Sequence, residues 1–326
     1  MRKSPCCGSK IWILPARRRQ CSSCRSRWRI RAKKRGRHER RNDARLIAHV
    51  LSRPRSLTDL AQQARLSRQA ISARFRKALA RNVLAATEPG ALGSESILLV
   101  DGLWFRFKRR PWVLYLTALR PVQEDRATFL DPVLLEGVES KEAWVKVIGM
   151  LPEDRRASIR AIVGDKFSGC RDIARSNGWI LQLCHFHLLA QFKGRVTLRS
   201  TTKARVLRQE VYKLISKALL TSDRAKLNSI RFCLKAFLAE ANTPKRYKSL
   251  VRGFLRTSDD YHAYLIHPEL RLPRTNGTSE AMARRVRDLL YRTRSLSSPA
   301  ALQNWATSLV RLKPTIMCRP GSQPPN

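Results

Sequence analysis

Two aspartates stand where the chain can bind divalent metal ions. Asp101 ends the apolar run SILLVD, and Asp165 ends a second apolar run, ASIRAIVGD. If the two runs form neighbouring strands, their carboxylates meet, and the repulsion is costly unless divalent cations neutralise it. Mg²⁺ or Mn²⁺ suits such oxygen ligands and keeps positions for water and phosphate. Two ions about 4 Å apart activate a nucleophile and stabilise a leaving oxygen during in-line displacement.

A third carboxylate has to come from a later helix. The segment TNGTSEAMARRVRDLLYRT reads as a helix capped by Thr278 or Ser279, with Glu280 in its first turn. An acid at that place also interacts favourably with the helix dipole, so an isolated glutamate would be assigned to capping alone. Asp288, the other acid of this helix, lies among leucines and is the weaker candidate. A lone aspartate at a strand end is likewise most often a turn residue, and two such strands on one basic chain favour chemistry.

Alternating strands and helices would position these acids. We expect strands at 96–101, 104–109, 111–119, 157–165 and 179–186, with helices at 133–151 and from 166 onward. This order of three strands, helix, strand, helix and strand is that of the ribonuclease-H-like fold. In that topology the strands that carry Asp101 and Asp165 are neighbours at the sheet centre. The adjacent Gly102 and Gly164 are expected to leave room for a close phosphate.

The charge of the chain indicates a polyanionic partner. Its 326 residues include 66 Lys and Arg against 24 Asp and Glu, a formal charge of +42. Such a charge repels itself in the folded state, and phosphates that neutralise it release counterions. We therefore expect double-stranded DNA as partner. No membrane-length apolar run or signal peptide is evident, so the expected location is cytoplasmic, associated with the nucleoid in a prokaryote.

Residues 56–79 read as a helix-turn-helix. The spacing of Leu60, Ala61, Leu66 and Ile71 is the buried packing that this motif needs. Ser56 or Thr58 would cap the first helix, and Ser67 the second. The residues expected to contact DNA are Arg68, Gln69, Ser72, Arg74 and Arg76. The alternative is an ordinary three-helix bundle whose basic faces are merely solvated.

Four cysteines near the N-terminus suggest a small zinc ribbon. Cys7 is separated by 13 residues from the C-x-x-C formed by Cys21 and Cys24. Ser4 occupies the place of the usual first cysteine, so the fourth ligand is either Cys6 or His38. The alternative is a basic tail whose cysteines are free thiols.

Five tryptophans belong to the expected strands and helices beyond residue 95. They are Trp104, Trp112, Trp144, Trp179 and Trp305. Tryptophan in such elements is more often a core residue than a base-stacking one, so we expect these side chains to be buried.

Taken together, the motifs resemble the DDE transposases of bacterial insertion sequences, including those related to the eukaryotic mutator-like elements. The matching pieces are VDG at 100–102, GDKFSG at 164–169, LCHFH at 183–187 and TNGTSE at 275–280. The resemblance implies that Asp101, Asp165 and Glu280 are the catalytic acids, which hold two Mg²⁺ or Mn²⁺ ions. It also implies that the long interval between the last two acids contains a helical insertion, at about 189–273.

The same resemblance assigns a C-x-x-H motif to Cys184 and His187. It implies a structural role, or the positioning of DNA or of the glutamate helix. Without the family these residues would read as a buried thiol and a capping histidine, and zinc binding would need two further ligands that the nearby sequence does not offer. Arg284 and Arg285, one turn after Glu280, are expected to bind the DNA backbone.

The predicted fold is an α/β ribonuclease-H-like catalytic core with a helical insertion, preceded by a zinc-ribbon-like segment and a helix-turn-helix domain. The expected parts are the ribbon at 1–40, the helix-turn-helix at 41–87, the core at 95–188 and 274–313, the insertion at 189–273, and a flexible tail at 314–326.

The predicted function is metal-dependent cleavage at the ends of an insertion sequence. The freed 3′-hydroxyl then attacks target DNA, and a homo-oligomer bridges the two ends. The alternatives are a transposase-derived regulator that binds DNA without catalysis, and a ribonuclease-H-like nuclease.

Overall fold

The computed structural model describes residues 7–14, 18–29, 36–52, 56–85, 95–193, 202–240, 245–293 and 298–320. The chain divides into two compact units, Met1–Ala78 and Leu79–Asn326. The division falls inside a helix, whereas a boundary after residue 87 was expected. Among the described helices, none combines the length and the apolar character needed to cross a bilayer.

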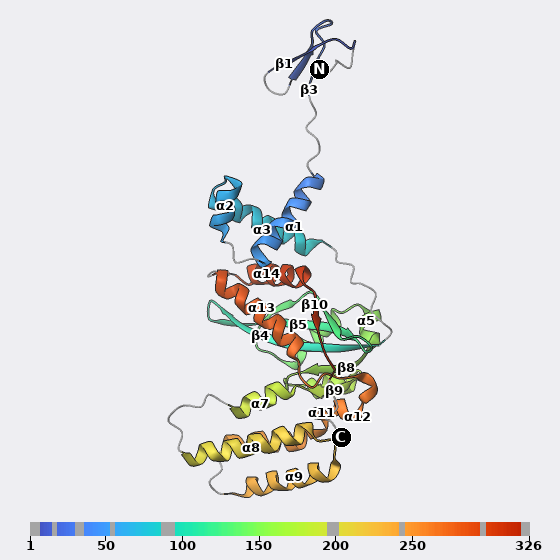
Figure 1. Ribbon diagram of the computed structural model, residues 1–326, viewed down its shortest axis with the longest axis vertical. Helices are drawn as coiled ribbons and strands as arrows, with labels where there is room; N and C mark the ends of the chain where they lie inside the picture. The colour runs from blue at the N-terminus through green and yellow to red at the C-terminus, as the bar shows by residue number, and fades with distance from the viewer. Residues whose placement is uncertain are drawn as a thin grey trace. The chain divides into compact units, whose positions relative to one another are not determined.

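The first unit contains a small sheet followed by helices (Figure 1). Strands β1 (Ile11–Leu14), β2 (Arg18–Cys21) and β3 (Arg27–Arg29) pair antiparallel in that order. Helices α1 (Gly36–Ser52), α2 (Leu57–Ala64) and α3 (Arg68–Leu84) follow. The α2–α3 pair covers the segment in which the helix-turn-helix was expected.

Local hydrogen bonds fix where α2 and α3 begin. The Ser56 hydroxyl accepts the Asp59 amide at 3.1 Å, and Oδ2 of Asp59 accepts the Ser56 amide at 3.0 Å, which together form a capping box. The Ser67 hydroxyl accepts the Ala70 amide at 3.1 Å and begins α3. Ser56 rather than Thr58 is therefore the cap of α2, and Ser67 caps α3 as expected.

The core of this helix pair differs from the expected one at a single residue. Leu60, Ala61 and Ile71 are buried together against Leu46, Val50 and Leu57. Leu66, however, is 44% exposed, so the prediction that it is buried was wrong. Arg65 adopts a left-handed conformation with φ 51°, and this turn directs the next residue away from the helix pair.

A mixed seven-stranded sheet organises the second unit. Its strands are β4 (Ser96–Phe107), β5 (Arg110–Pro121), β6 (Arg126–Phe129), β7 (Val133–Glu136), β8 (Ile159–Gly164), β9 (Ile180–Leu183) and β10 (Thr315–Met317). Their order is β10-β6-β5-β4-β8-β9, with β7 also paired to β5. The β4–β5, β5–β6, β5–β7 and β6–β10 pairs are antiparallel, whereas β4–β8 and β8–β9 are parallel. The chain is therefore a mixed α/β protein.

Helices surround this sheet and extend beyond one edge of it. They are α4 (Lys141–Gly149), α5 (Glu153–Ser158), α6 (Cys170–Ser176), α7 (His185–Lys193), α8 (Thr202–Leu220), α9 (Arg224–Ala239), α10 (Lys245–Arg256), α11 (Ser258–Tyr261), α12 (Ala263–Ile266), the 3₁₀ turn η1 (Pro268–Leu270), α13 (Gly277–Thr293) and α14 (Pro299–Leu312). Figure 1 shows α13 and α14 on one side of the sheet and α7 to α9 beyond its β9 edge. Helices make up most of the described residues between 189 and 273, the range for which a helical insertion was predicted.

Three expected element boundaries were wrong. The expected strands 96–101 and 104–109 are one twelve-residue strand, β4, because Gly102 continues the pairing with β5. Residues 133–136 form β7 rather than the start of a helix, since they pair with β5 and Gly137 has φ 117°. The tail is ordered up to residue 320, where β10 pairs with β6 and Cys318 is buried, and residues 321–326 lie outside the described part.

The tryptophans do not all lie in the core. Trp144 and Trp179 are buried as expected, and Trp112 and Trp305 are partly buried. Trp104 is 54% exposed, so the prediction that it is a core residue was wrong. It lies in the part of β4 that extends past its pairing with β8, whereas Trp144 lies on α4 within the core of the second unit.

Candidate metal centre

The two predicted aspartates lie at the same level of adjacent parallel strands. The β4–β8 ladder ends with Leu99 paired to Val163, and Asp101 and Asp165 each follow two residues later. Asp101 is buried, whereas Asp165 is partly exposed and accepts the Lys166 amide on its Oδ1 atom at 2.6 Å. The sheet thus brings both acids to the point where β8 ends.

Asp101 meets Glu280 and one further residue, His187. One ligand atom from each of these three side chains lies within 4.8 Å of those of the other two. His187 is in the first turn of α7, and Glu280 is in the first turn of α13. The Nε2 atom of His187 lies 2.8 Å from Oε1 of Glu280. Asp165, the other expected ligand, is not one of these three residues, although its charge acts on His187.

The carboxylate of Asp101 lacks a compensating partner. Its Oδ2 atom is buried, and no hydrogen bond reaches it from the part of the chain that the structure describes. Burial, together with the negative charge of Glu280, raises the pKa of Asp101 to about 7, against the opposing effect of His187. A buried carboxylate in this state takes up either a proton or a cation.

The pKa of His187 is raised beside these acids. Burial alone would lower its pKa, but hydrogen bonds with Cys184 and Glu280 and the charge of Asp165 outweigh burial and raise the pKa to about 11. The same hydrogen bond lowers the pKa of Glu280 and keeps that carboxylate ionised. The imidazolium therefore donates to Glu280 and fixes the carboxylate at the start of α13.

Asn276, to which the sequence assigned no role, attaches α13 to the sheet. Its side-chain amide donates to the Val100 carbonyl at 2.6 Å, and its backbone N–H donates to the Cys184 sulfur at 3.2 Å. The Glu280 amide donates to the Asn276 carbonyl at 3.0 Å. Asn276 thus links the residue before Asp101, the C-x-x-H motif and the turn that carries Glu280.

The cap predicted for this helix was wrong. Helix α13 begins at Gly277, two residues earlier than a Thr278 cap requires. The Thr278 hydroxyl instead donates to the Met317 carbonyl at 3.0 Å, which joins α13 to β10. The Ser279 hydroxyl is buried and has no hydrogen-bond partner among the described residues. Asn276 therefore occupies the position before the helix that the hydroxyl residues were expected to fill.

Glu139 is a further acid near the centre that the sequence did not reveal. Its Oε1 atom accepts the Trp144 indole N–H at 2.9 Å. Burial raises its pKa, hydrogen bonds with Trp144 and Trp104 lower it, and the charge of Asp165 raises it. A single glutamate before a helix gives no signal in the sequence, because only the fold brings it to β4.

The two glycines beside the aspartates accommodate protein atoms. A Cβ atom at Gly102 would lie 2.9 Å from Oε1 of Glu139, and one at Gly164 would lie 2.5 Å from Cγ2 of Val100. The space that was expected to receive a phosphate is therefore filled by these side chains. Both glycines allow close packing around the acids.

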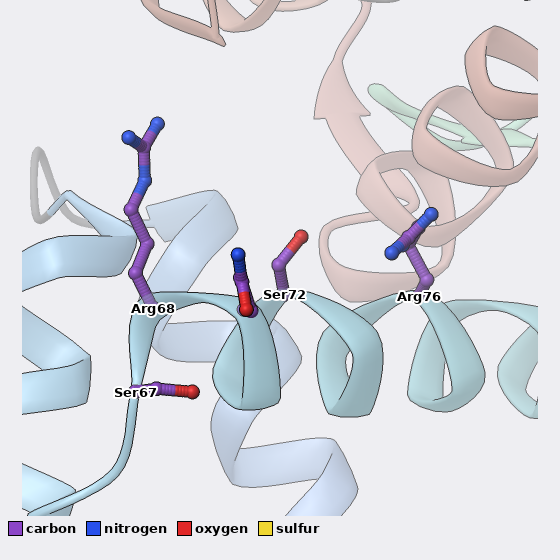
Figure 2. A pocket seen from close by; sticks show the side chains of 5 residues that line it. Ser67, Arg68, Ser72 and Arg76 are labelled. Carbon is purple, nitrogen blue, oxygen red and sulfur yellow. The ribbon is translucent and has the colours of Figure 1, made fainter.

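The predicted DNA-contacting residues are exposed on the described surface, except Ser72, which is half-buried. Arg68, Ser72 and Arg76 project from the same side of α3, and with Ser67 and Gln69 they line a hollow of about 510 Å³ (Figure 2). Arg74 is also exposed on α3, as are Arg284 and Arg285 on α13. Arg284 and Arg287 lie close enough to Glu280 to lower its pKa.

Three of the N-terminal cysteines converge. One sulfur from each of Cys7, Cys21 and Cys24 lies within 4.8 Å of the other two, and Cys7 and Cys21 are 3.2 Å apart. The loops of the small sheet bring them together, and Cys21 is buried. Cys6 and the side chain of His38, the two candidates for a fourth ligand, lie outside the described residues.

No protein-family model matches the chain, and no curated protein matches it.

Proposed function

We propose that the chain is a transposase that cleaves DNA at the ends of an insertion sequence and joins them to target DNA. The observation that carries the proposal is the convergence of Asp101, on β4, with Glu280, on α13, at the level where Asp165 follows β8. Acids from three distant segments lie toward one end of a central strand pair, on a chain with a formal charge of +42. This combination suits metal-dependent chemistry on a polyanion.

The sheet supports a ribonuclease-H-like assignment. Its strands β6-β5-β4-β8-β9 follow the order expected of that fold, with the first pairs antiparallel and the last two parallel. The first acid is on the central strand, the second follows its parallel neighbour, and the third opens a late helix. Fold alone does not define an activity, so the acids carry the functional argument.

The residues present fit divalent metal ions. Asp101 offers a buried oxygen without a hydrogen-bond partner among the described residues, and the pKa of its carboxyl is raised by burial and by Glu280. Asp101, Asp165 and Glu280 would hold two Mg²⁺ or Mn²⁺ ions, hard cations that prefer oxygen ligands. Bound there, these ions supply the activation of a nucleophilic oxygen and the stabilisation of a leaving oxygen at phosphorus.

Other residues of the chain orient the acids and the DNA. His187 donates to Glu280 and holds that carboxylate at 2.8 Å, while Asn276 holds the start of α13 against β4. Arg284 and Arg285 are exposed beyond Glu280 and would bind backbone phosphates near the site. Water attacks the phosphodiester in the cleavage step and a DNA 3′-hydroxyl attacks in the joining step, so the reaction needs no serine or tyrosine nucleophile.

The first unit would supply recognition of the DNA ends. The exposed face of α3, with Arg68, Gln69, Ser72 and Arg76 around one hollow, suits base edges in the major groove (Figure 2). The Cys7, Cys21 and Cys24 cluster would hold a structural Zn²⁺ with a fourth ligand. A transposase has to bridge two ends, so we propose a homo-oligomer.

The test is strand transfer by the full-length protein. Labelled duplexes from the DNA that flanks the coding sequence would be mixed with a supercoiled target plasmid and Mg²⁺ or Mn²⁺. We expect joined products that require the metal and disappear in Asp165→Asn. Asp172→Asn, which alters an exposed acid paired with Lys141, is the matched control and should remain active.

Other outcomes favour the two alternatives. Sequence-specific binding without cleavage under either metal would overturn the enzyme assignment and favour a DNA-binding regulator. Metal-dependent cleavage without joining would instead favour a nuclease.

A further inference from the structure

The hairpin that joins β4 to β5 carries a hollow outside the metal centre. Trp104, Phe105, Arg106, Arg109, Pro111 and Val138 line this hollow, which has a volume of about 530 Å³. Trp104 is 54% exposed, and Arg106 and Arg109 are both exposed. Neither arginine forms an ion pair with a carboxylate of the described residues, whereas the neighbouring Arg110 pairs with Glu136 at 3.1 Å. The hollow thus combines an exposed aromatic ring with two available cations.

The backbone fixes the form of this hairpin. Phe105 pairs with Trp112 and Phe107 with Arg110, so the turn consists of Lys108 and Arg109 alone. Both turn residues have positive φ, 48° and 67°, which side chains other than glycine seldom adopt. The tight turn places two basic residues at the tip of a projecting pair of strands.

The hollow and the metal centre use the same strand but lie on opposite faces of it, because Asp101 and Trp104 are three residues apart and side chains alternate along a strand without a bulge. Strand β4 pairs with β8 only up to Leu99, and from Asp101 to Phe107 its pairing is with β5. Trp104 is the third residue after Asp101, which corresponds to about 10 Å of extended strand.

A hydrogen bond with Glu139 constrains the orientation of the Trp104 ring. A hydrogen bond from the Trp104 side chain stabilises the charged form of Glu139, which also accepts the Trp144 indole N–H at 2.9 Å. The indole polar atom is therefore engaged on the protein side. The exposed remainder of the side chain is apolar and flat, with cations beside it.

We infer that this hollow binds an unstacked nucleobase of the DNA on which the proposed transposase acts. An aromatic face stacks on any base, and the two arginines bind the flanking phosphates. A second copy of this chain is a poor occupant, because it would bring +42 of like charge to a cationic surface. The inference rests on the proposed function, since the base belongs to the DNA that the proposed transposase binds.

The test measures binding without metal, so that catalysis does not enter. Full-length protein in EDTA would be titrated with a duplex that ends in a short single strand containing 2-aminopurine, and with the same duplex fully paired. We expect tighter binding to the open end and a change in 2-aminopurine fluorescence on stacking. Trp104→Ala should weaken that binding about five- to a hundredfold, which is the contribution of one stacked base, and should leave the paired duplex unaffected. Trp104→Phe should retain most of the preference.

Controls separate stacking from general effects. Phe232→Ala removes another exposed ring, 74% exposed on α9, and should not alter the preference for open ends. Arg106→Gln should lower the salt dependence of binding to the open end.

Equal binding of both duplexes by the wild type, or an unchanged preference in Trp104→Ala, would overturn the inference. Strand transfer that persists in Trp104→Ala with unaltered binding would leave the transposase assignment intact. If the protein prefers open ends through Trp104 but never cleaves DNA, base binding in the hollow is supported and the transposase assignment is wrong.

Discussion

The Nε2 atom of His187 lies 2.8 Å from Oε1 of Glu280, although α7 and α13 are separated along the chain by the whole helical segment from α8 to η1. This contact is made by a histidine whose pKa is raised, beside a glutamate whose pKa is lowered. It fixes one acid of the proposed metal centre before any ion binds. The contact therefore makes His187 a positioning residue for Glu280.

We predict that His187→Ala weakens Mn²⁺ binding about 10- to 100-fold, because the Glu280 carboxylate loses the group that orients it. Isothermal calorimetry with Mn²⁺ measures the change. His267→Ala is the matched control, since Nδ1 of His267 lies 3.3 Å from Oε1 of Glu269 in a more exposed pair. If both variants bind Mn²⁺ like the wild type, His187 does not position a ligand.

A second prediction concerns stability against pH in the metal-free protein. The pKa of Asp101 in the folded state, about 7, is above its usual 3.8, so the folded state retains a proton that the unfolded state releases. Stability should therefore fall as pH rises between these two values. Asp101→Asn removes this penalty and should raise the unfolding temperature in EDTA more at pH 8 than at pH 4.5.

Thermal unfolding at the two pH values checks this prediction, and added Mn²⁺ provides its control. The ion should stabilise the wild type at pH 8 and have little effect on the variant. An equal gain for Asp101→Asn at both pH values would contradict burial as the cause.

The sequence revealed the acids more reliably than their surroundings. Asp101 and Asp165 end apolar runs that are visible without a structure, and strand order then places them at the same level of adjacent strands. Glu139 and Asn276 could not be identified from the sequence. Glu139 lies against Gly102 and Asn276 donates to the Val100 carbonyl, and only the fold creates these two contacts with β4.

Two predicted element boundaries were wrong because long-range contacts with the sheet decide them. Gly102 looked like the end of a strand, but its missing side chain makes room for Glu139 while the backbone continues to pair. Residues 133–136 carry an apolar run that suits a helix or a strand equally, and pairing with β5 decides the outcome. Long-range pairing of this kind cannot be read from local propensity.

A further prediction concerns the stability contributed by Arg120, which contacts the segment that precedes α13. Its side chain is fully buried and donates to the carbonyls of Glu124, Leu270 and Arg271 at 3.1, 3.1 and 2.6 Å. Arg120→Met leaves these carbonyls without their donor, and we expect a loss of about 3 kcal/mol in the free energy of unfolding.

Urea denaturation measures this loss. Arg110→Met, which breaks only the exposed pair with Glu136, is the control and should cost less than about 1 kcal/mol. Equal effects of the two substitutions would mean that burial of Arg120 adds nothing to stability.

The N-terminal cysteines give a prediction that is independent of catalysis. If Cys7, Cys21 and Cys24 hold a structural Zn²⁺, purified protein should contain one zinc per chain. Cys21→Ser should lose that zinc, whereas Cys233→Ser, which alters an exposed cysteine on α9, should retain it. Metal analysis of both variants checks this, and a wild-type protein without zinc would favour free thiols.

Gly164 tests whether the spacing between β4 and β8 matters to the metal centre. A Cβ atom there would lie 2.5 Å from Cγ2 and 3.2 Å from the carbonyl oxygen of Val100, the residue before Asp101. Gly164→Ala should therefore move the two strands apart, at a cost of about 1–3 kcal/mol in stability, and weaken Mn²⁺ binding. Gly149→Ala, where the added atom meets nothing within 4 Å, should be neutral or slightly stabilising.

A double variant identifies the cause of that effect. Val100→Ala removes the Cγ2 atom that the new methyl group would meet, so the Gly164→Ala, Val100→Ala protein should recover part of the lost Mn²⁺ affinity. The two substitutions should then be coupled rather than additive, as expected for residues in contact. Calorimetry on the four proteins of this cycle measures the coupling. Strict additivity would show that Gly164 acts through something other than the separation of the strands that carry Asp101 and Asp165.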